Sequence, residues 1–232
     1  MSKIKINMPE KGAAVQKDRE TYAISPYLPG GLADPDTLRK IADVAEKYDA
    51  KFLKLTSEHR ITIYGIPFED IDNIWKDLGM EPGGLSGKIV RPVKFCIGSS
   101  SCKMAKQNTM ELGMEIDKQF RGIKTPDKMK IAVSGCENSC AEPAVRDIGL
   151  IGTKEGWNVL VGGNAGLQPR IGKLIAKNLS DEEVLDLIDK IISYYKENGE
   201  KTGLSRRLGK VIHSIGFEKF SQEILENNKK ES

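Results

Sequence analysis

The chain has 232 residues, of which 39% are apolar and 30% are charged, and its formal net charge is +3. This composition is typical of one large or two small globular domains, and the small net charge argues against a general nucleic-acid-binding protein. The sequence has no run of about 18 apolar residues, so we expect no membrane span. The N-terminus has no apolar signal region, so we expect a cytoplasmic protein without nucleic-acid or membrane partners.

The first part of the chain has the pattern of a small α+β unit. Its predicted elements are, in chain order, a strand running into a loop at 21–31, a helix begun by Asp34-Pro35, strands at 51–56 and 60–66, and a helix ended by Gly79. The first helix is predicted to bury Leu38, Ile41, Ala45 and Tyr48, which recur at helical spacing. This β-α-β-β-α order predicts helices on one face of an antiparallel sheet.

A segment at 81–84 with one proline and two glycines is typical of a hinge, so we expect domains at residues 1–84 and 85–232. The predicted elements after the hinge are a strand at 89–95, a helix at 103–120, a strand at 128–133, a hairpin at 148–151 and 158–161, and a helix that begins with a capping box at Ser180 and ends at Asn198-Gly199.

The four cysteines form two pairs, Cys96-x5-Cys102 and Cys136-x3-Cys140. Disulfides are not expected without an export signal. A structural zinc site is an alternative, although zinc sites as a rule use tighter cysteine turns. Soft thiolates also select iron–sulfur clusters, and one [4Fe–4S] cluster needs four of them. Spacing and ligand chemistry favour the cluster and leave the zinc site open.

The residues around the cysteines add to this interpretation. The small residues at 98–101 and Gly135 let backbone N–H groups approach sulfur and hydrogen-bond to it. Between Lys88 and Lys130 there are ten Lys or Arg and four Asp or Glu, a local charge of +6. This charge predicts a small anion or an anionic cofactor near the thiols, and a solvated lysine face is the alternative.

The cysteines and their surroundings resemble the signature of the siroheme-dependent sulfite and nitrite reductases. The segments that carry the resemblance are LTSEHRITIYGI at 55–66, KMKIAVSGC at 128–136, CAE at 140–142, DIGLIG at 147–152 and GWNVLVGGNAG at 156–166. The resemblance implies an α+β fold, in which a ferredoxin-like half domain at 1–84 precedes a mixed α/β domain at 85–232 that binds siroheme and a [4Fe–4S] cluster. The chain contains this unit once, as in the small, low-molecular-weight assimilatory-type sulfite reductases.

The resemblance implies an oxidoreductase that reduces sulfite to sulfide with six electrons. The sequence has no Rossmann-type dinucleotide motif and no further cysteines, so we expect electrons from a separate carrier such as ferredoxin. Lys103 and Lys106 are candidate docking charges for an acidic donor. Reduction of nitrite to ammonia is one alternative function, and a non-catalytic siroheme or iron–sulfur carrier subunit is another. Because the large members of the family contain the unit twice, we expect a homo-oligomer.

The resemblance also implies roles for individual residues. The implied cluster ligands are Cys96, Cys102, Cys136 and Cys140, of which Cys140 also bridges to the siroheme iron. The implied anion-binding residues are Arg60, Arg91, Lys128 and Lys130, and the two lysines alternate on the predicted strand and so share a face. The implied siroheme contacts, besides Cys140, are His59, Asn138, Gly163 and Asn164.

Three of these assignments have a structural alternative. Lys128 and Lys130 are also consistent with the solvent side of a half-buried strand. His59 stands in a Ser-Glu-His-Arg run where the large sulfite reductases have Thr-Arg-Gln, and it is equally consistent with a histidine at a strand end. The loop at 162–166 lacks the Gly-Lys-Ser/Thr ending of a phosphate-binding loop, and it is also consistent with a tight strand-to-helix turn.

Overall fold

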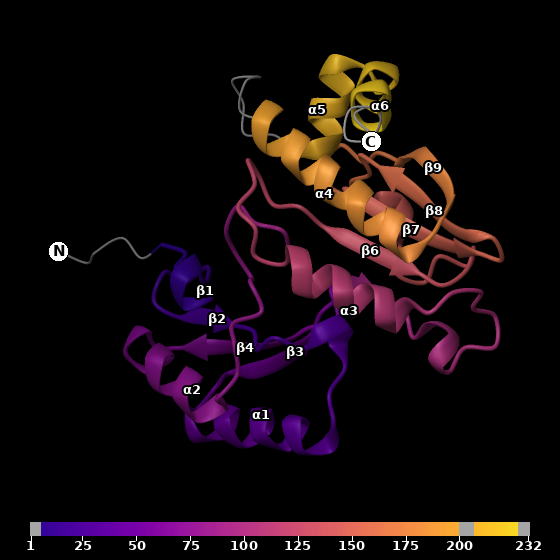
Figure 1. Ribbon diagram of the computed structural model, residues 1–232. Coiled ribbons are helices and arrows are strands. Elements are labelled where there is room, and N and C mark those ends of the chain that lie inside the picture. Colours follow the sequence, from indigo (N-terminus) through magenta and orange to yellow (C-terminus); the bar gives the residue numbers. More distant parts are fainter. Residues whose placement is uncertain (1–5, 200–206, 227–232) are drawn as a thin grey trace. The chain divides into compact units, whose positions relative to one another are not determined.

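The structure, a computed structural model, describes residues 6–199 and 207–226. The chain divides into two compact units between Gly87 and Lys88, and each unit has its own sheet (Figure 1). This division lies three residues beyond the end of the hinge segment at 81–84. No helix in the described ranges has both the length and the apolar character that crossing a bilayer requires.

The first unit is a four-stranded antiparallel sheet with two helices. The strands, in their order across the sheet, are β1 (Ala13–Val15), β2 (Tyr22–Ile24), β4 (Ile61–Ile66) and β3 (Phe52–Leu55). The helices are α1 (Pro35–Lys47) and α2 (Ile71–Leu78), with short 3-10 turns η1 (Pro9–Lys11), η2 (Pro29–Gly31) and η3 (Phe68–Asp70). Figure 1 shows both helices on the same face of the sheet, which confirms the predicted β-α-β-β-α arrangement and adds the edge strand β1.

Helix α1 begins where its capping residues predict. The Asp34 carboxylate accepts the Thr37 N–H at 2.6 Å and so satisfies one of the free donors of the first turn. Ile41 and Ala45 are buried as expected, but Leu38 is exposed and the prediction for it is wrong. Val44 is buried, so the buried stripe is carried by the second half of the helix.

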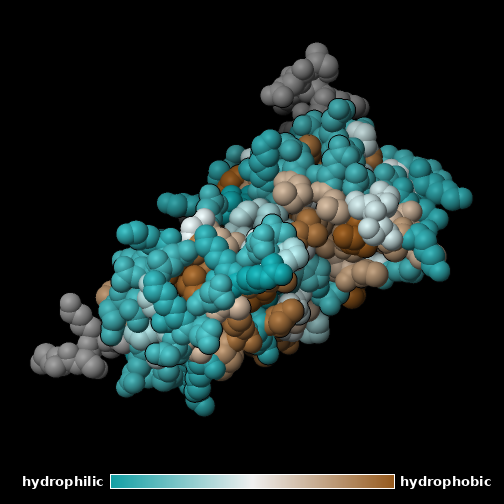
Figure 2. Space-filling model, turned by 90° about the horizontal axis from the view of Figure 1, so that it is seen from below, coloured by the Kyte–Doolittle hydropathy of each residue, from teal (hydrophilic) through white to brown (hydrophobic). Residues whose placement is uncertain are grey.

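Strand β3 is exposed although three of its four residues are apolar. All of its residues are exposed, including Phe52 and Leu55, and the Leu55 side chain is 82% exposed. The strand lies at the edge of its sheet and pairs only with β4, so fewer neighbours cover its apolar side chains. Apolar side chains also reach the surface at other places among the hydrophilic residues, as Figure 2 shows.

The second unit is built on a five-stranded mixed sheet. Its strands are, in order, β5 (Lys94–Phe95), β6 (Ile131–Ser134), β7 (Ile148–Thr153), β8 (Gly156–Val161) and β9 (Lys173–Leu179). The first three are parallel to one another, and the last three are successively antiparallel. The helices are α3 (Thr109–Phe120), α4 (Asp181–Asn198), α5 (Leu208–Ile215) and α6 (Phe217–Glu226), with 3-10 turns η4 (Gly98–Ser100) and η5 (Pro143–Val145).

One face of this sheet forms the core of the second unit. Phe95, Val133 and Leu150 are side by side in the register of the parallel strands and all belong to the core. The apolar faces of α3 and α4 pack into the same core, and Figure 1 shows both helices along the sheet. The capping box predicted at Ser180 is present and begins α4.

Several boundaries in the second unit differ from the prediction. The strand expected at 89–95 is reduced to β5, and Pro92 interrupts it because proline has no N–H for the ladder. The helix expected from residue 103 begins at Thr109, because the Asn108 side chain caps it by accepting the Glu111 N–H. Strand β9 and helices α5 and α6 were not among the predicted elements.

Candidate functional site

Two parallel strands bring two of the cysteines to the same edge of the mixed sheet. Phe95 of β5 lies opposite Val133 of β6, so Cys96 leaves β5 at the edge where Gly135 and Cys136 leave β6. The Gly135 N–H donates to Cys96 Sγ at 3.3 Å, as the small residues predict. Such N–H donors orient a sulfur ligand and tune the metal that it holds.

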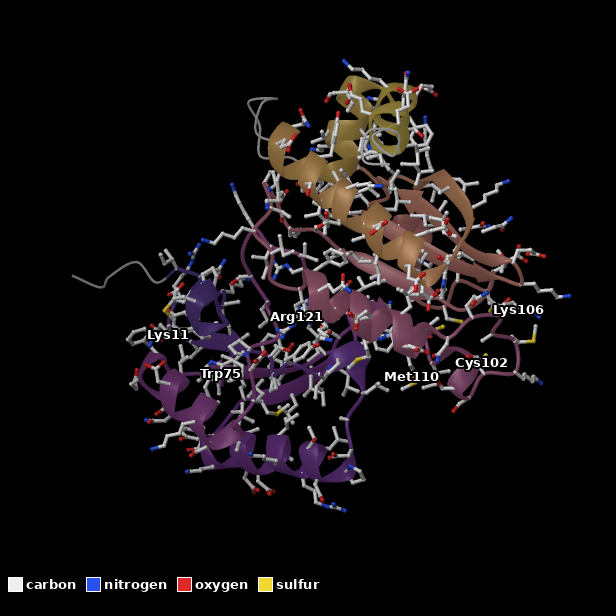
Figure 3. All side chains as sticks on the ribbon, in the orientation of Figure 1. Lys11, Trp75, Cys102, Lys106, Met110 and Arg121 are labelled. Carbon is white, nitrogen blue, oxygen red and sulfur yellow. The ribbon has the colours of Figure 1, made fainter. Side chains whose placement is uncertain are left out.

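The loop that carries Cys102 folds back onto this edge. The Lys106 N–H donates to the Gly135 carbonyl oxygen at 2.6 Å, and Figure 3 shows Cys102 and Lys106 close to the start of α3. The loop begins at Gly98, where φ is +58° and a Cβ would lie 2.2 Å from Thr109 Oγ1. Only glycine fits there without strain, so the loop reaches the cysteine edge through a position that admits no side chain.

Cys140 lies on a loop that the sheet itself holds. The Ala141 N–H donates to Ser134 Oγ at 3.0 Å. The segment that carries the second cysteine pair therefore turns back over β6. The next segment, η5, packs so tightly on β7 that a Cβ at Gly149 would lie 2.1 Å from a carbonyl oxygen of η5. Cys140 is exposed, which leaves its sulfur accessible to a ligand.

The η5 segment lies on the face of the sheet that is turned away from the core. The residues one position before the core row, Lys94, Ala132 and Gly149, are also in register with one another. Because side chains alternate along a strand, this second row points to the face opposite α3 and α4. This second face is buried, and η5 covers it at Gly149.

The donor set fits an iron–sulfur cluster. All four cysteines are free of disulfides. Among the residues that the structure describes, no three or more His, Cys, Asp or Glu side chains are grouped around a single metal ion. A [4Fe–4S] cluster spreads four thiolates over four iron atoms, and here three cysteine-bearing segments meet at one sheet edge with an N–H donor on sulfur.

The predicted cations of the second unit gather near the start of β6. The Arg91 N–H donates to the Met129 carbonyl oxygen at 2.8 Å, which places it beside Lys128 and Lys130. Arg91 is buried, Lys130 is half-buried and Lys128 is exposed. Both lysines precede β6 rather than lying on it as predicted, because the Lys130 N–H bonds to the Asp147 carboxylate at 2.8 Å instead of to a strand.

These cations and the cysteines lie at opposite ends of β6. Lys130 is four residues before Ser134, which holds the Cys140 loop, and this spacing corresponds to about 13 Å along a strand. Cys136 follows the end of β6 by two residues. The second unit thus brings Arg91, Lys128 and Lys130 to the start of β6 and brings Cys96 and Cys136 to its other end.

His59 and Arg60 lie in the first unit, in the turn between β3 and β4. His59 has φ +55°, and its Nδ1 is 3.2 Å from the Gly30 carbonyl oxygen. The Arg60 N–H donates to Thr56 Oγ1 at 3.2 Å, and its guanidinium donates to the Gly84 carbonyl oxygen at 3.4 Å. His59 therefore occupies a strand-end position, and a siroheme contact for it stays a prediction.

The remaining predicted siroheme contacts lie in two loops. Asn138 is exposed between the last two cysteines. A Cβ at Gly163 would lie 2.5 Å from the Ala144 carbonyl oxygen, so this glycine is needed for backbone packing. Asn164 donates from its side-chain amide to the Gln168 carbonyl oxygen at 3.2 Å and closes the loop. The loop joins β8 to β9, so the strand-to-helix alternative is wrong, and siroheme contacts of these residues stay predictions.

Both units match domain models of known proteins. Residues 14–81 match the model of the nitrite/sulfite reductase ferredoxin-like half domain, and residues 86–232 match the model of the nitrite and sulphite reductase 4Fe-4S domain. The chain belongs to the nitrite and sulfite reductase family. This family member is 37% identical to the assimilatory-type sulfite reductase of Nitratidesulfovibrio vulgaris, over 93% of its own length and 97% of that protein. It is 42% identical to the nitrite reductase (NAD(P)H) of Bacillus subtilis over 80% of its own length but spans only 23% of that protein.

Two solved structures share the fold of this chain. Dissimilatory sulfite reductase I aligns with a TM-score of 0.77 at 17% identity, over 88% of this chain and 68% of that chain. The NirA protein of Mycobacterium tuberculosis aligns with a TM-score of 0.79 at 20% identity, over 90% of this chain and 40% of that chain. The family models confirm the predicted order of a ferredoxin-like half domain followed by a mixed α/β domain.

An ion cluster lies beside Cys140, and no pattern in the sequence predicted it. Glu142 Oε2 accepts hydrogen bonds from Lys94 Nζ at 3.1 Å and from Arg146 Nη2 at 2.7 Å. The Lys94 bond, with the charge of Arg146, lowers the pKa of the Glu142 carboxyl below its usual value. Lys94 is 48 residues from Glu142 in the chain, so no local pattern predicts this contact.

A second ion pair fixes the backbone at Lys130. Asp147 is fully buried, and its carboxylate accepts from Arg207 Nε at 3.0 Å and Nη2 at 2.5 Å as well as from the Lys130 N–H. Burial raises the pKa of the Asp147 carboxyl, and the hydrogen bonds from Arg207 oppose that rise. The DIGLIG segment that carries the family resemblance begins at Asp147, and this signal could have pointed to the residue.

Proposed function

We propose that this chain is a siroheme–[4Fe–4S] enzyme that reduces sulfite to sulfide with six electrons. The observation that carries the proposal is the meeting of the cysteine-bearing segments at one edge of the mixed sheet, with an N–H donor on the Cys96 sulfur. The extent of the match to an assimilatory-type sulfite reductase, 97% of that protein's length, supports sulfite as the substrate. Reduced thiols also fit a cytoplasmic enzyme.

The cysteines are the residues that would hold both groups. Cys96, Cys102 and Cys136 would bind the cluster alone, and Cys140 would bind the cluster and give its sulfur to the siroheme iron. The exposure of Cys140 supports this double role, because a second metal needs access to the sulfur. When bound, the cluster and siroheme would store and deliver the electrons that the reduction consumes.

The cations are the residues that would bind the substrate. Arg60 and Arg91 offer planar forks that match two oxygens of an oxyanion, and Lys128 and Lys130 offer compact charges. Burial of Arg91 strengthens its attraction for an anion, because less water screens the charge. Each loss of oxygen from sulfur consumes protons, and a lysine ammonium beside the bound anion can supply one and recover it from solvent.

A homo-oligomer, in which the cations of one copy complete the substrate pocket of another, is part of this proposal. The distance of about 13 Å or more along β6 between Lys130 and the cysteine end supports it. The test is complementation between two inactive chains, one with Cys140→Ser and one with both Lys128→Ala and Lys130→Ala. Mixed oligomers should regain sulfite reduction. No recovery in a purified mixed oligomer, or a monomer in sedimentation, would contradict a shared pocket.

An external protein would deliver the electrons close to Cys136. A cleft of about 290 Å³ opens beside this cysteine, and its charged lining comprises Lys106, Lys154, Glu137 and Glu155. With the neighbouring Lys103, these lysines suit an acidic one-electron carrier such as ferredoxin. Lys103→Glu with Lys106→Glu should raise the KM for a reduced acidic carrier and leave the rate with reduced methyl viologen unchanged.

The central experiment is the oxidation of reduced methyl viologen by the anaerobically purified protein. Protein with full siroheme and cluster content should turn over with sulfite, and its visible spectrum should show the siroheme bands. No turnover with either sulfite or nitrite would exclude the enzyme function.

Nitrite is the second candidate substrate, and the 42% identity to a nitrite reductase favours it. A higher kcat/KM for nitrite than for sulfite would replace the sulfite assignment. The carrier alternative predicts that Lys130→Ala lowers siroheme content and turnover equally, whereas the enzyme predicts a larger loss of turnover.

A further inference from the structure

Glu142 is held by two buried cations, although its own side chain is half exposed. The side chains of Lys94 and Arg146 are each 6% exposed, and that of Glu142 is 54% exposed. Both cations donate to the same carboxylate oxygen, Oε2. Buried cations need a counter-charge, so this carboxylate is anchored more firmly than a surface glutamate.

The backbone around Glu142 is shaped for this contact. Ser139 and Glu142 have φ of +54° and +58°, the left-handed region in which glycine or asparagine is the usual residue. The Glu142 N–H donates to the Ser139 carbonyl oxygen at 2.8 Å, which closes the turn around Cys140. A glutamate at such a position carries a backbone cost, and its side-chain bonds offset that cost.

The ion cluster connects two of the cysteine segments. Lys94 lies on β5, two residues before Cys96, and Glu142 lies two residues after Cys140. The bond between Lys94 and Glu142 therefore ties the strand that leads to one sulfur to the turn that presents the other. The Ala141 N–H bond to β6 anchors the same turn a second time.

We propose that Glu142 is a positioning residue, which holds Cys140 at a fixed place relative to Cys96 through Lys94 and Arg146 and so sets the properties of the iron–sulfur cluster. The proposal rests on the proposed role of the four cysteines as cluster ligands. Glu142 also balances one of two positive charges beside the cluster. Its removal adds one net positive charge there, which favours the reduced, more negative cluster.

The test compares Glu142→Gln with the wild type in protein that carries its cluster. Glu142→Gln should raise the midpoint potential of the cluster and change the EPR spectrum of its reduced form. Glu142→Asp, which keeps the charge, should have a midpoint potential and an EPR spectrum closer to those of the wild type. The matched control is Glu137→Gln, which removes an exposed carboxylate from the same loop and should leave both close to wild type.

A double variant separates positioning from charge. Lys94→Gln with Glu142→Gln has the same net charge as the wild type but no bridge between the two segments. If Glu142 positions Cys140, the altered EPR spectrum persists in the double variant. A return to the wild-type spectrum and potential would show that only charge matters and would overturn the proposal. An unchanged midpoint potential and EPR spectrum in Glu142→Gln would overturn the proposal as well.

If Glu142→Gln does not fold, the double variant can be measured in its place, because its net charge equals that of the wild type. These readouts come from the cluster alone. A wild-type protein that holds its cluster but does not reduce sulfite or nitrite would refute the proposed function. The potential and the EPR spectrum of the Glu142 variants could still be measured and interpreted.

Discussion

Replacement of Arg207 by methionine should destabilise the second unit strongly. Asp147 has no exposed surface, and the Arg207 side chain is only 15% exposed. The guanidinium makes two hydrogen bonds to the carboxylate, so Arg207→Met leaves a buried charge with one backbone N–H as its remaining donor among the described residues. Loss of one partner of a buried pair costs about 3–5 kcal/mol, and we expect a loss in this range.

Urea denaturation followed by tryptophan fluorescence measures this loss. Trp75 lies in the first unit and Trp157 is buried in the second, so a Trp75→Phe background reports on the second unit alone. The matched control is Lys219→Gln, which removes an exposed ion pair with Glu223 in the same unit. That pair should contribute less than about 1 kcal/mol.

A double variant checks the physical cause. Asp147→Asn with Arg207→Met removes both charges and keeps an amide oxygen as acceptor for the Lys130 N–H. It should recover most of the stability that Arg207→Met loses, because no unpaired charge remains. A loss below about 1 kcal/mol for Arg207→Met, as for a surface pair, would refute the reasoning.

Three further predictions concern local features. Gly98→Ala should cost at least about 1 kcal/mol in urea denaturation and lower iron content, because a Cβ would lie 2.2 Å from Thr109 Oγ1 at φ +58°; unchanged iron content would contradict this. The Thr21 hydrogen bonds lower the pKa of Asp18 to about 2, so their stabilisation is present above pH 3.8 and is lost as the pH falls toward 2; an NMR titration midpoint near 3.8 would be inconsistent with it. Ser180→Ala removes the capping box of α4 and should lower the unfolding free energy by about 1 kcal/mol, and an unshifted urea midpoint would speak against that role.

Local signals in the sequence were sufficient for the elements that begin or end on a side-chain cap. Asp34 begins α1 and Ser180 begins α4 as predicted, because a cap is a contact between residues three positions apart. The cysteine spacing and the segments around it were sufficient for the family, which the two matching domain models confirm. Residue type and spacing carry this information before any folding takes place.

Contacts between distant residues were decided only by the tertiary structure. The partners of the Asp147–Arg207 pair are 60 residues apart, and those of the Lys94–Glu142 pair are 48 apart. The exposure of Leu55 follows from the place of β3 at a sheet edge, which the apolar pattern of the strand does not encode. The separation of the cations from the cysteines likewise depends on which end of β6 each group occupies. A sequence records which groups are available, and only the packed chain determines which of them lose water and meet.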